Sequence, residues 1–270
     1  INPDGVVFGA TSSLDVSGSF HVSSADYLLL EDGGQFFADP TANSVLTVGN
    51  PSTFGFLQEP TGTIELDGAQ LMAPDGQTVS LVAHEVEIYN RATLTAAGGR
   101  LNLASVGSAG EVALLADGIN NSSISYDGDE SVSMGGMSTL DVDGEGGGSI
   151  YIRGGQFSME GDETITANTE GAIDGGVVDI NVAGSVSIQG VITANTSGSG
   201  TGGDVSISVQ SVNFSERNGG IGGQSLIETL AESSGDAGSI SLTAVGGINM
   251  ESTLRVGTES TGDAGNISIS

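Results

Sequence analysis

The C-terminal half of the chain repeats itself, and this repeat restricts the fold more than any other feature of the sequence. Each unit opens with a glycine, and aliphatic residues follow two and four positions later. Because alternate residues of a β-strand point to the same side, each glycine is expected to begin a half-buried strand. The opening glycines are Gly148, Gly176, Gly203, Gly238 and Gly265, spaced 28, 27, 35 and 27 residues apart.

Two apolar columns run through these units and predict the core. The first column, two residues after each glycine, consists of Ile150, Val178, Val205, Ile240 and Ile267. The second column, eleven residues before the last four glycines, consists of Ile165, Ile192, Ile227 and Leu254. A third strand signal lies near Val186 and Ile188. Three short strands in about 27 residues predict one coil of a right-handed, single-stranded parallel β-helix, an all-β solenoid.

Other repetitive folds do not fit the pattern. The units lack a 3.6-residue period and contain several glycines each, which argues against helical repeats. Glycine is not every third residue and the chain has only 5 prolines, which excludes collagen. The 35-residue spacing contains an insertion near residues 215–220, which we expect to bulge from one edge of the solenoid.

The N-terminal half repeats with a shorter period. Val79 and Leu81 match Leu101 and Leu103, 22 residues further on. Residues 6–57 are less regular and contain most of the phenylalanines. This segment is expected to form either a thicker core or hairpins packed outside the solenoid.

Charge and cysteine content narrow the possible partners and chemistry. The chain has 34 acidic and 5 basic residues, all of the latter arginine, for a net charge of −29. Such a surface repels nucleic acids and anionic membranes. With no cysteine, the chain has no disulfide or thiol chemistry. No apolar run approaches the ~20 residues of a membrane helix, so we expect no membrane insertion.

Several N-terminal segments resemble the secretion domain of two-partner secretion exoproteins such as filamentous haemagglutinin. Asn2-Pro3-Asp4-Gly5 resembles the Asn-Pro-Asn-Gly segment of that domain, with Asp4 in place of the usual asparagine. The other matching segments are residues 18–20, 24–26, 44–48, 54–56 and 98–106. The resemblance implies export by a dedicated outer-membrane β-barrel transporter, then folding outside the cell as a β-helical adhesin or surface fibre.

We divide the chain into three parts on this basis. Residues 1–115 are assigned to the C-terminal part of a secretion domain. Residues 116–146 are expected to form an irregular acidic transition. Residues 147–270 are assigned to β-helical passenger repeats of about 27 residues. Because the chain opens without a signal peptide and stops within a strand pattern, we expect it to be a fragment that continues beyond residue 270.

Asn2-Pro3-Asp4-Gly5 is also the signature of a type I turn, with proline at the second position and glycine at the fourth. The same four residues are our candidate secretion motif, so one segment has a structural and a functional interpretation. Asn168 and Asn195 lie one period apart and are expected to stack as an asparagine ladder.

Asp141, Asp143 and Glu145 alternate along a glycine-rich loop and are the candidate residues for a weakly bound calcium ion. The alternative is a solvated acidic loop without a ligand. The sequence indicates no other cofactor, because His21 and His84 have no second ligand at zinc spacing.

No catalytic residue is assigned, and we expect the protein not to be an enzyme. The chain contains neither a Gly-x-Ser-x-Gly elbow nor a phosphate-binding loop. A β-helical polysaccharide lyase or hydrolase is the less favoured alternative, because lysine is absent and the arginines are dispersed.

The favoured function is a secreted adhesin or structural fibre, extracellular or on the surface of a bacterium with an outer membrane. Its receptor on a host cell, a neighbouring cell or a matrix is not specified by the sequence. A self-assembling filament subunit, in which copies associate end to end, is the other alternative.

Overall fold

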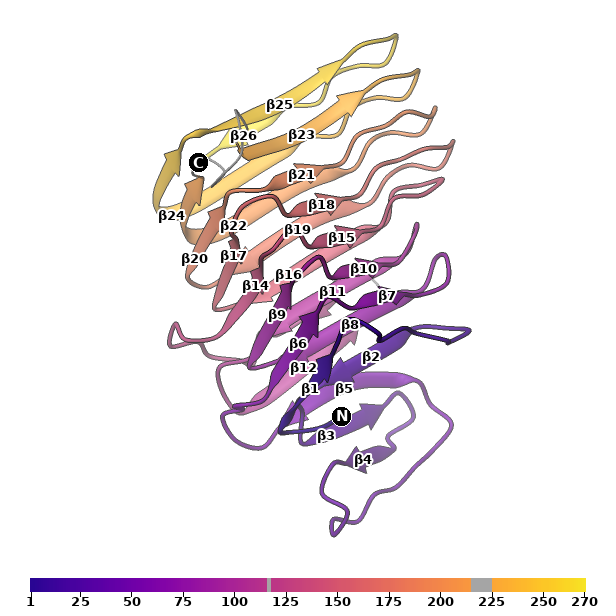
Figure 1. Ribbon diagram of the computed structural model, residues 1–270, viewed down its shortest axis with the longest axis vertical. Coiled ribbons are helices and arrows are strands. Elements are labelled where there is room, and N and C mark those ends of the chain that lie inside the picture. Colours follow the sequence, from indigo (N-terminus) through magenta and orange to yellow (C-terminus); the bar gives the residue numbers. More distant parts are fainter. Residues whose placement is uncertain (116–117, 215–224) are drawn as a thin grey trace.

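The computed structural model shows the chain wound into a parallel β-helix whose strands stack along the long axis of the molecule (Figure 1). The structure describes residues 1–115, 118–214 and 225–270. All of the regular elements in these residues are β-strands. Each coil contributes strands to three faces, so the predicted fold is confirmed.

The first face contains the strands that follow the opening glycines and their N-terminal equivalents. These are β2 (Phe20–Ser23), β8 (Thr78–Ala83), β11 (Arg100–Ser105), β16 (Ser149–Gly154), β19 (Val177–Val182), β22 (Asp204–Phe214), β24 (Ile240–Met250) and β26 (Ile267–Ile269).

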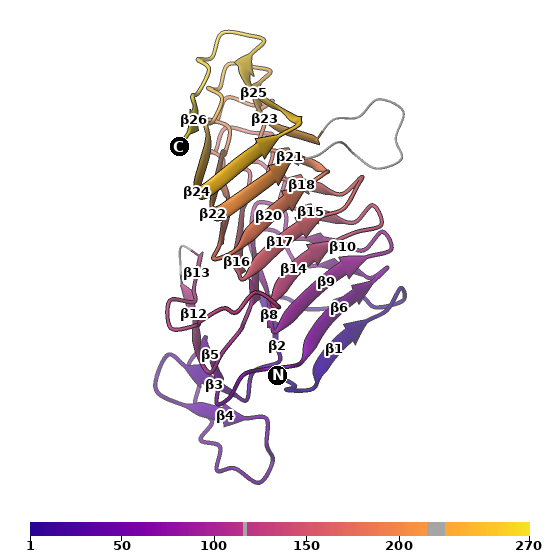
Figure 2. The same cartoon turned by 90° about the vertical axis from the view of Figure 1, so that its left-hand side faces the viewer.

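The second face runs side by side with the first and is seen in Figure 2. It consists of β1 (Gly5–Phe8), β6 (Thr63–Asp67), β9 (Glu85–Tyr89), β14 (Ser131–Met134), β17 (Gln156–Met159) and β20 (Ser185–Ile188). The long strands β22 and β24 turn the corner, and their second halves extend this face.

The third face closes the coil. It consists of β7 (Gln70–Met72), β10 (Thr93–Thr95), β15 (Thr139–Asp141), β18 (Thr164–Thr166), β21 (Val191–Thr193), β23 (Ser225–Ala231) and β25 (Ser252–Thr258).

The apolar columns of the sequence are stacked in register. On the first face Ile150 pairs with Val178, followed by Val205, Ile240 and Ile267. On the third face the corresponding series is Ile165, Ile192, Ile227 and Leu254. Most of these side chains are fully buried in one continuous core along the axis.

Close contact between coils explains the glycine that opens each unit. A Cβ atom on Gly238 would overlap the carbonyl oxygen of Gly203, and one on Gly265 would overlap that of Gly238. The backbone of these glycines is not in the left-handed region. Glycine is therefore needed at these positions because the backbones of successive coils touch there, and any side chain would push the coils apart.

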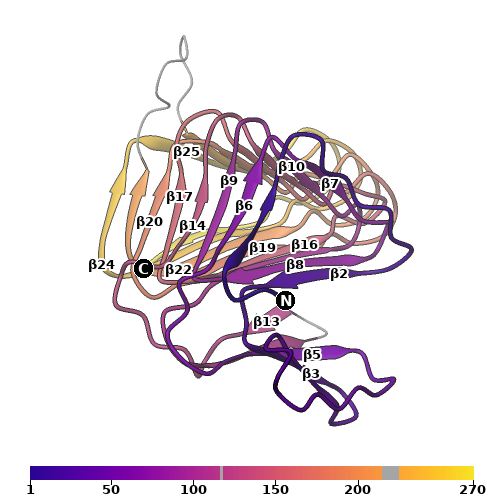
Figure 3. The ribbon, with the colours of Figure 1, turned by 60° about the horizontal axis from the view of Figure 1, so that its bottom comes forward.

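An antiparallel sheet lies outside the solenoid, against the first face (Figure 3). One insertion, between β2 and β6, contributes β3 (Tyr27–Leu30), β4 (Gln35–Phe37) and β5 (Pro51–Phe56), and a second, between β11 and β14, contributes β12 (Gly110–Leu115) and β13 (Gly118–Asn120). Phe54 of β5 pairs with Val112 of β12, and both pack on Val82 and Ala104 of the first face. The strands, in spatial order, are β13 (Gly118–Asn120), β12 (Gly110–Leu115), β5 (Pro51–Phe56), β3 (Tyr27–Leu30) and β4 (Gln35–Phe37).

Of the two expectations for the phenylalanine-rich segment, packed extra-helical hairpins are therefore correct. Residues 116–146, expected to be irregular, contain the coil strands β14 and β15. β14 pairs with β9 below and β17 above, so the stacking continues through this segment. The insertion expected at residues 215–220 lies outside the described residues.

The stacked columns predict that substitutions at inward positions of a strand reduce stability more than substitutions at outward positions of the same strand. Ile192→Ala should lower the free energy of unfolding by about 2–5 kcal/mol, because its side chain is fully buried between Ile165 and Ile227. Thr193→Ala, on the outward side of the same strand, should change it by only about 0.5 kcal/mol. Chemical denaturation of both variants checks this. Equal effects would contradict the assigned inward and outward sides.

Candidate functional site

The candidate secretion motif forms the turn that leads into β1. The backbone N–H of Gly5 donates to the carbonyl oxygen of Asn2 at 3.0 Å, closing the four-residue turn that the sequence predicts. The Asn2 side-chain amide donates back to the carbonyl oxygen of Gly5 at 2.7 Å. The backbone N–H of Asn2 donates to Ser23 at 2.9 Å, which joins the turn to β2.

Gly5 meets two requirements at this turn. Its φ angle is +98°, a conformation that favours glycine. A Cβ atom here would also overlap the backbone of Thr63, on the adjacent strand β6. Asp4, the residue that departs from the family pattern, is exposed and faces a hollow of about 120 Å³.

These contacts rank substitutions in the motif. Asn2→Ala should lower the free energy of unfolding by about 1 kcal/mol, because it removes the hydrogen bond from the Asn2 side chain to Gly5. Gly5→Ala should cost more, because the added carbon meets β6 in a strained backbone conformation. Asp4→Asn is the matched control and should leave stability unchanged. Hydrogen exchange at the β1 amides measures all three, and uniform protection across the variants would refute the ordering role of the turn.

Asn168 and Asn195 stack one coil apart as expected, but their side chains bond to backbone N–H groups and to carboxylates and not to each other. Asn168 Oδ1 accepts the backbone N–H of Asn195 at 2.9 Å, and Asn195 Oδ1 accepts that of Leu230 at 2.8 Å. One coil earlier, Asp143 Oδ1 accepts the backbone N–H of Asn168 at 2.7 Å. Asp143 Oδ2 accepts the side-chain amide of Asn168 at 3.1 Å. Each side chain thus satisfies a backbone donor of the following coil.

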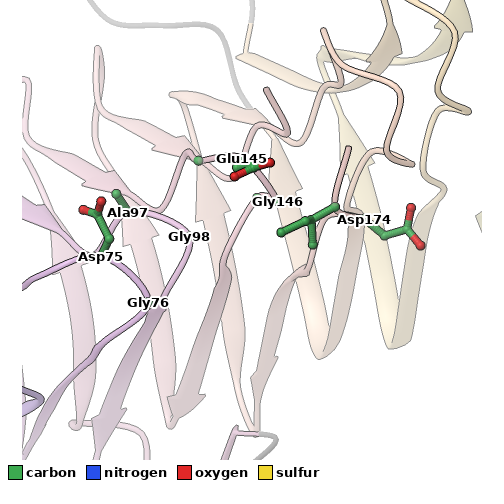
Figure 4. A pocket seen from close by; sticks show the side chains of 10 residues that line it. Asp75, Gly76, Ala97, Gly98, Glu145, Gly146 and Asp174 are labelled. Carbon is green, nitrogen blue, oxygen red and sulfur yellow. The ribbon is translucent and has the colours of Figure 1, made fainter. Parts of the chain in front are cut away.

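The three candidate calcium ligands lie in different surroundings. Asp143 is bonded to Asn168, and Asp141 Oδ1 accepts the backbone N–H of Asp143 at 2.9 Å. Glu145 instead lines a hollow of about 350 Å³ on the turns before the first face, where its carboxylate stands apart from those of Asp75 and Asp174 (Figure 4). No group of three or more His, Cys, Asp or Glu side chains in the described part of the chain is placed to hold a metal ion.

Calcium binding by Asp141, Asp143 and Glu145 therefore stays a prediction, and an ion there would compete with Asn168 for Asp143. It is tested by melting temperatures in CaCl₂ and NaCl at matched ionic strength. A calcium-specific rise that Asp141→Asn removes would support the site. Equal stabilisation by the two salts would identify screening of a solvated acidic loop.

Several acidic turn residues have a structural role that sequence reasoning missed. Asp236 Oδ1 accepts the backbone N–H of Asp263 at 2.7 Å, and Asp204 Oδ1 accepts that of Ser239 at 2.7 Å. Asp174 Oδ1 does the same for Thr201 at 2.9 Å. A signal was present, because the triplet Asp-Ala-Gly recurs at residues 236–238 and 263–265, one period apart.

Both histidine rings lie within hydrogen-bonding distance of groups of the chain itself. His21 Nδ1 lies 2.9 Å from Ser80 Oγ, but Ser80 is fully buried beside Asn102, whose amide donates to the same oxygen at 3.2 Å. Burial lowers the pKa of His21. His84 Nδ1 lies 3.2 Å from the carbonyl oxygen of Val106. Both rings therefore serve as packing and hydrogen-bonding groups.

Glu163 is a buried carboxyl group that the sequence did not distinguish from its acidic neighbours. It is fully buried just before β18, where Oε1 accepts the backbone N–H of Met137 at 3.3 Å and Oε2 has no hydrogen-bond partner. Desolvation raises its pKa, and the negative charges of Asp162 and Glu160 add to that effect.

Because the pKa of Glu163 is higher in the folded than in the unfolded chain, ionisation opposes folding. The contribution of Glu163 should therefore lower the stability of the folded chain as pH rises from the ordinary glutamate pKa of about 4.3 through the raised folded value. Glu163→Gln should be more stable than wild type at pH 7, with the advantage disappearing in acid. Melting temperatures across this pH range check the prediction, and a pH-independent difference would contradict it.

Comparison with known proteins agrees with the N-terminal geometry. The sequence pattern of the TPS secretion domain matches residues 1–150, which include the Asn2–Gly5 turn and the whole antiparallel sheet. The chain belongs to the TPS secretion domain family. It is a two-partner secretion exoprotein, exported across the outer membrane by a TpsB transporter. No curated protein shows significant similarity to the chain.

The match extends beyond residue 115, where the sequence suggested that the secretion domain ends, and includes β14 and β15. No helix in the described residues is long and apolar enough to cross a membrane.

Proposed function

We propose that this exoprotein acts outside the cell as an adhesin or structural fibre on the bacterial surface, and that it has no enzymatic activity. The observation that carries the proposal is an uncharged outward surface on the second face, from β14 to β24. The outward residues of these strands are Ser131, Ser133, Gln156, Ser158, Ser185, Ser187, Ser211, Asn213, Gly247 and Asn249.

This surface differs from its surroundings in charge. The chain has a net charge of −29, and the same face carries Glu65, Glu85 and Glu87 in the preceding coils. Burial raises the pKa of Glu87, and the two neighbouring carboxylates raise it further. The outward side changes from glutamates to hydroxyl and amide groups at β14.

A neutral polar face suits contact with another surface. Acidic surfaces repel other negatively charged surfaces within about 8 Å at physiological salt. Hydroxyl and amide groups instead offer donors and acceptors without net charge. An open groove of about 540 Å³ follows Ser187, Asn213 and Asn249 across this part of the second face. The rigid stack of coils would present these groups at a regular spacing of about 4.8 Å along the axis.

The proposal that the protein is not an enzyme has separate support. Among the described residues, His21 is hydrogen-bonded to a serine, Ser80, whose side chain is fully buried. Turnover of a glycan by the purified chain would overturn this part of the proposal.

Adding charge to the second face tests the adhesive role. Ser187→Glu combined with Asn213→Asp places two carboxylates on the neutral surface. This should reduce attachment of the purified chain to cells or matrix, because repulsion opposes contact. The matched control, Asn181→Asp with Ser208→Glu, adds the same charge to outward positions of the first face. Equal loss of attachment in both variants, or none in either, would argue against an adhesive second face.

A further inference from the structure

The hollow beside the Asn2–Gly5 turn contains an incompletely bonded polar group. Ser24 lines it and is only 2% exposed, yet its Oγ has no hydrogen-bond partner in the described structure. Buried polar side chains are normally hydrogen-bonded to protein or to ordered water. The Ser24 hydroxyl is therefore an unsatisfied polar group buried in the wall of the hollow.

The hollow is also strongly acidic. Asp4, Asp26 and Glu59 line it, and none of the lining residues is basic. Asp26 is held in place, because its Oδ2 accepts the backbone N–H of Leu57 at 2.7 Å. The remaining polar side chains of the lining, Gln58 and Thr61, add neutral acceptors.

The walls of the hollow are fixed by backbone contacts. Gly62 packs so closely that an added Cβ atom would overlap the carbonyl oxygen of Pro3 and approach Ser24 Cβ to 2.9 Å. The turn is fastened to β2 by the bond from Asn2 to Ser23. Asp4 thus lies on a turn hydrogen-bonded to β2 and Asp26 on backbone hydrogen-bonded to β5, whereas Glu59 lies on the connection between β5 and β6.

We infer that this hollow binds the side-chain ammonium or guanidinium group of a lysine or arginine of a partner protein. Such a group donates several hydrogen bonds at once, which matches an unpartnered hydroxyl beside carboxylates and neutral acceptors. A metal ion is the weaker choice, since the described residues place no group of three or more acidic or histidine ligands around one point. The inference does not depend on the adhesive role of the second face.

The test is a titration of the chain followed by ¹H–¹⁵N NMR. The probes are N-acetyl-lysine methylamide and N-acetyl-arginine methylamide, with N-acetyl-norleucine methylamide as the uncharged analogue. Saturable shifts are expected at the amides of Asp4, Ser24 and Asp26 with at least one cationic probe and none with norleucine. Sodium chloride at matched ionic strength should not reproduce them.

Matched variants separate the hollow from the general negative charge. Glu59→Gln, at an exposed position, should weaken binding by roughly threefold to fivefold, the effect expected for losing one solvent-accessible ion pair. Glu251→Gln removes the same charge from an exposed position far along the axis and should leave binding unchanged. Ser24→Ala should also weaken binding.

Three results would overturn the inference. The first is the absence of saturable shifts with either cationic probe. The second is equal weakening by Glu59→Gln and Glu251→Gln, which would show attraction to the overall charge only. The third is a saturable shift of the same amides by calcium chloride that blocks the organic cations, which would identify a metal site instead.

Discussion

Backbone hydrogen bonding between successive coils is the interaction on which the rest of this structure depends. Parallel strands lie about 4.8 Å apart, so each residue sits directly against its equivalent in the next coil. Aliphatic residues recur at inward positions for this reason, as in Ile150, Val178 and Val205. Gly203 and Gly238 are glycines because their backbones come together with no room for a Cβ atom.

The same spacing governs the charged residues. Like charges in adjacent coils repel, and Glu65 beside Glu87 is the case where the effect on a pKa is seen. At another stacked position opposite charges meet, because the guanidinium of Arg255 lies 2.7 Å from the carboxylate of Glu228 in the adjacent coil. A chain with a net charge of −29 remains stackable partly because its turn aspartates bond to the backbone of the next coil.

The repeating strands could be predicted from the sequence. Contacts that occur only once in the fold could not. The columns at Ile165 and Ile192 could be read directly, because each residue has an equivalent one period away. The antiparallel sheet could be anticipated only as hairpins, since the pairing of Phe54 with Val112 joins two insertions that share no period. The turn at Asn2–Gly5 was predictable from local turn chemistry, whereas its bond to Ser23 depends on the fold.

Burial was the other property that the sequence did not reveal. Glu130 and Glu163 both have acidic residues as close neighbours in the sequence, yet both are fully buried. The oxygens of Glu130 accept the backbone N–H groups of Asp127 and Gly128 at 2.9 Å each, so it organises its own loop. Glu163 Oε2 has no hydrogen-bond partner. The sequence pattern around Glu163 does not distinguish it from Glu130, whose oxygens are hydrogen-bonded.

Cysteine cross-linking measures the inter-coil register most directly, because the chain has no cysteine of its own. Ser158 of β17 and Ser187 of β20 lie directly opposite each other. Ser185 points to the same side of β20 but lies two residues before Ser187. Adjacent parallel strands bring such a pair within the roughly 4.4–6.8 Å between Cα atoms that a disulfide spans. The stacked coils predict rapid oxidation of the Ser158→Cys/Ser187→Cys pair and slow oxidation of Ser158→Cys/Ser185→Cys. Faster oxidation of the second pair, or none of the first, would contradict the register on which the whole solenoid is built.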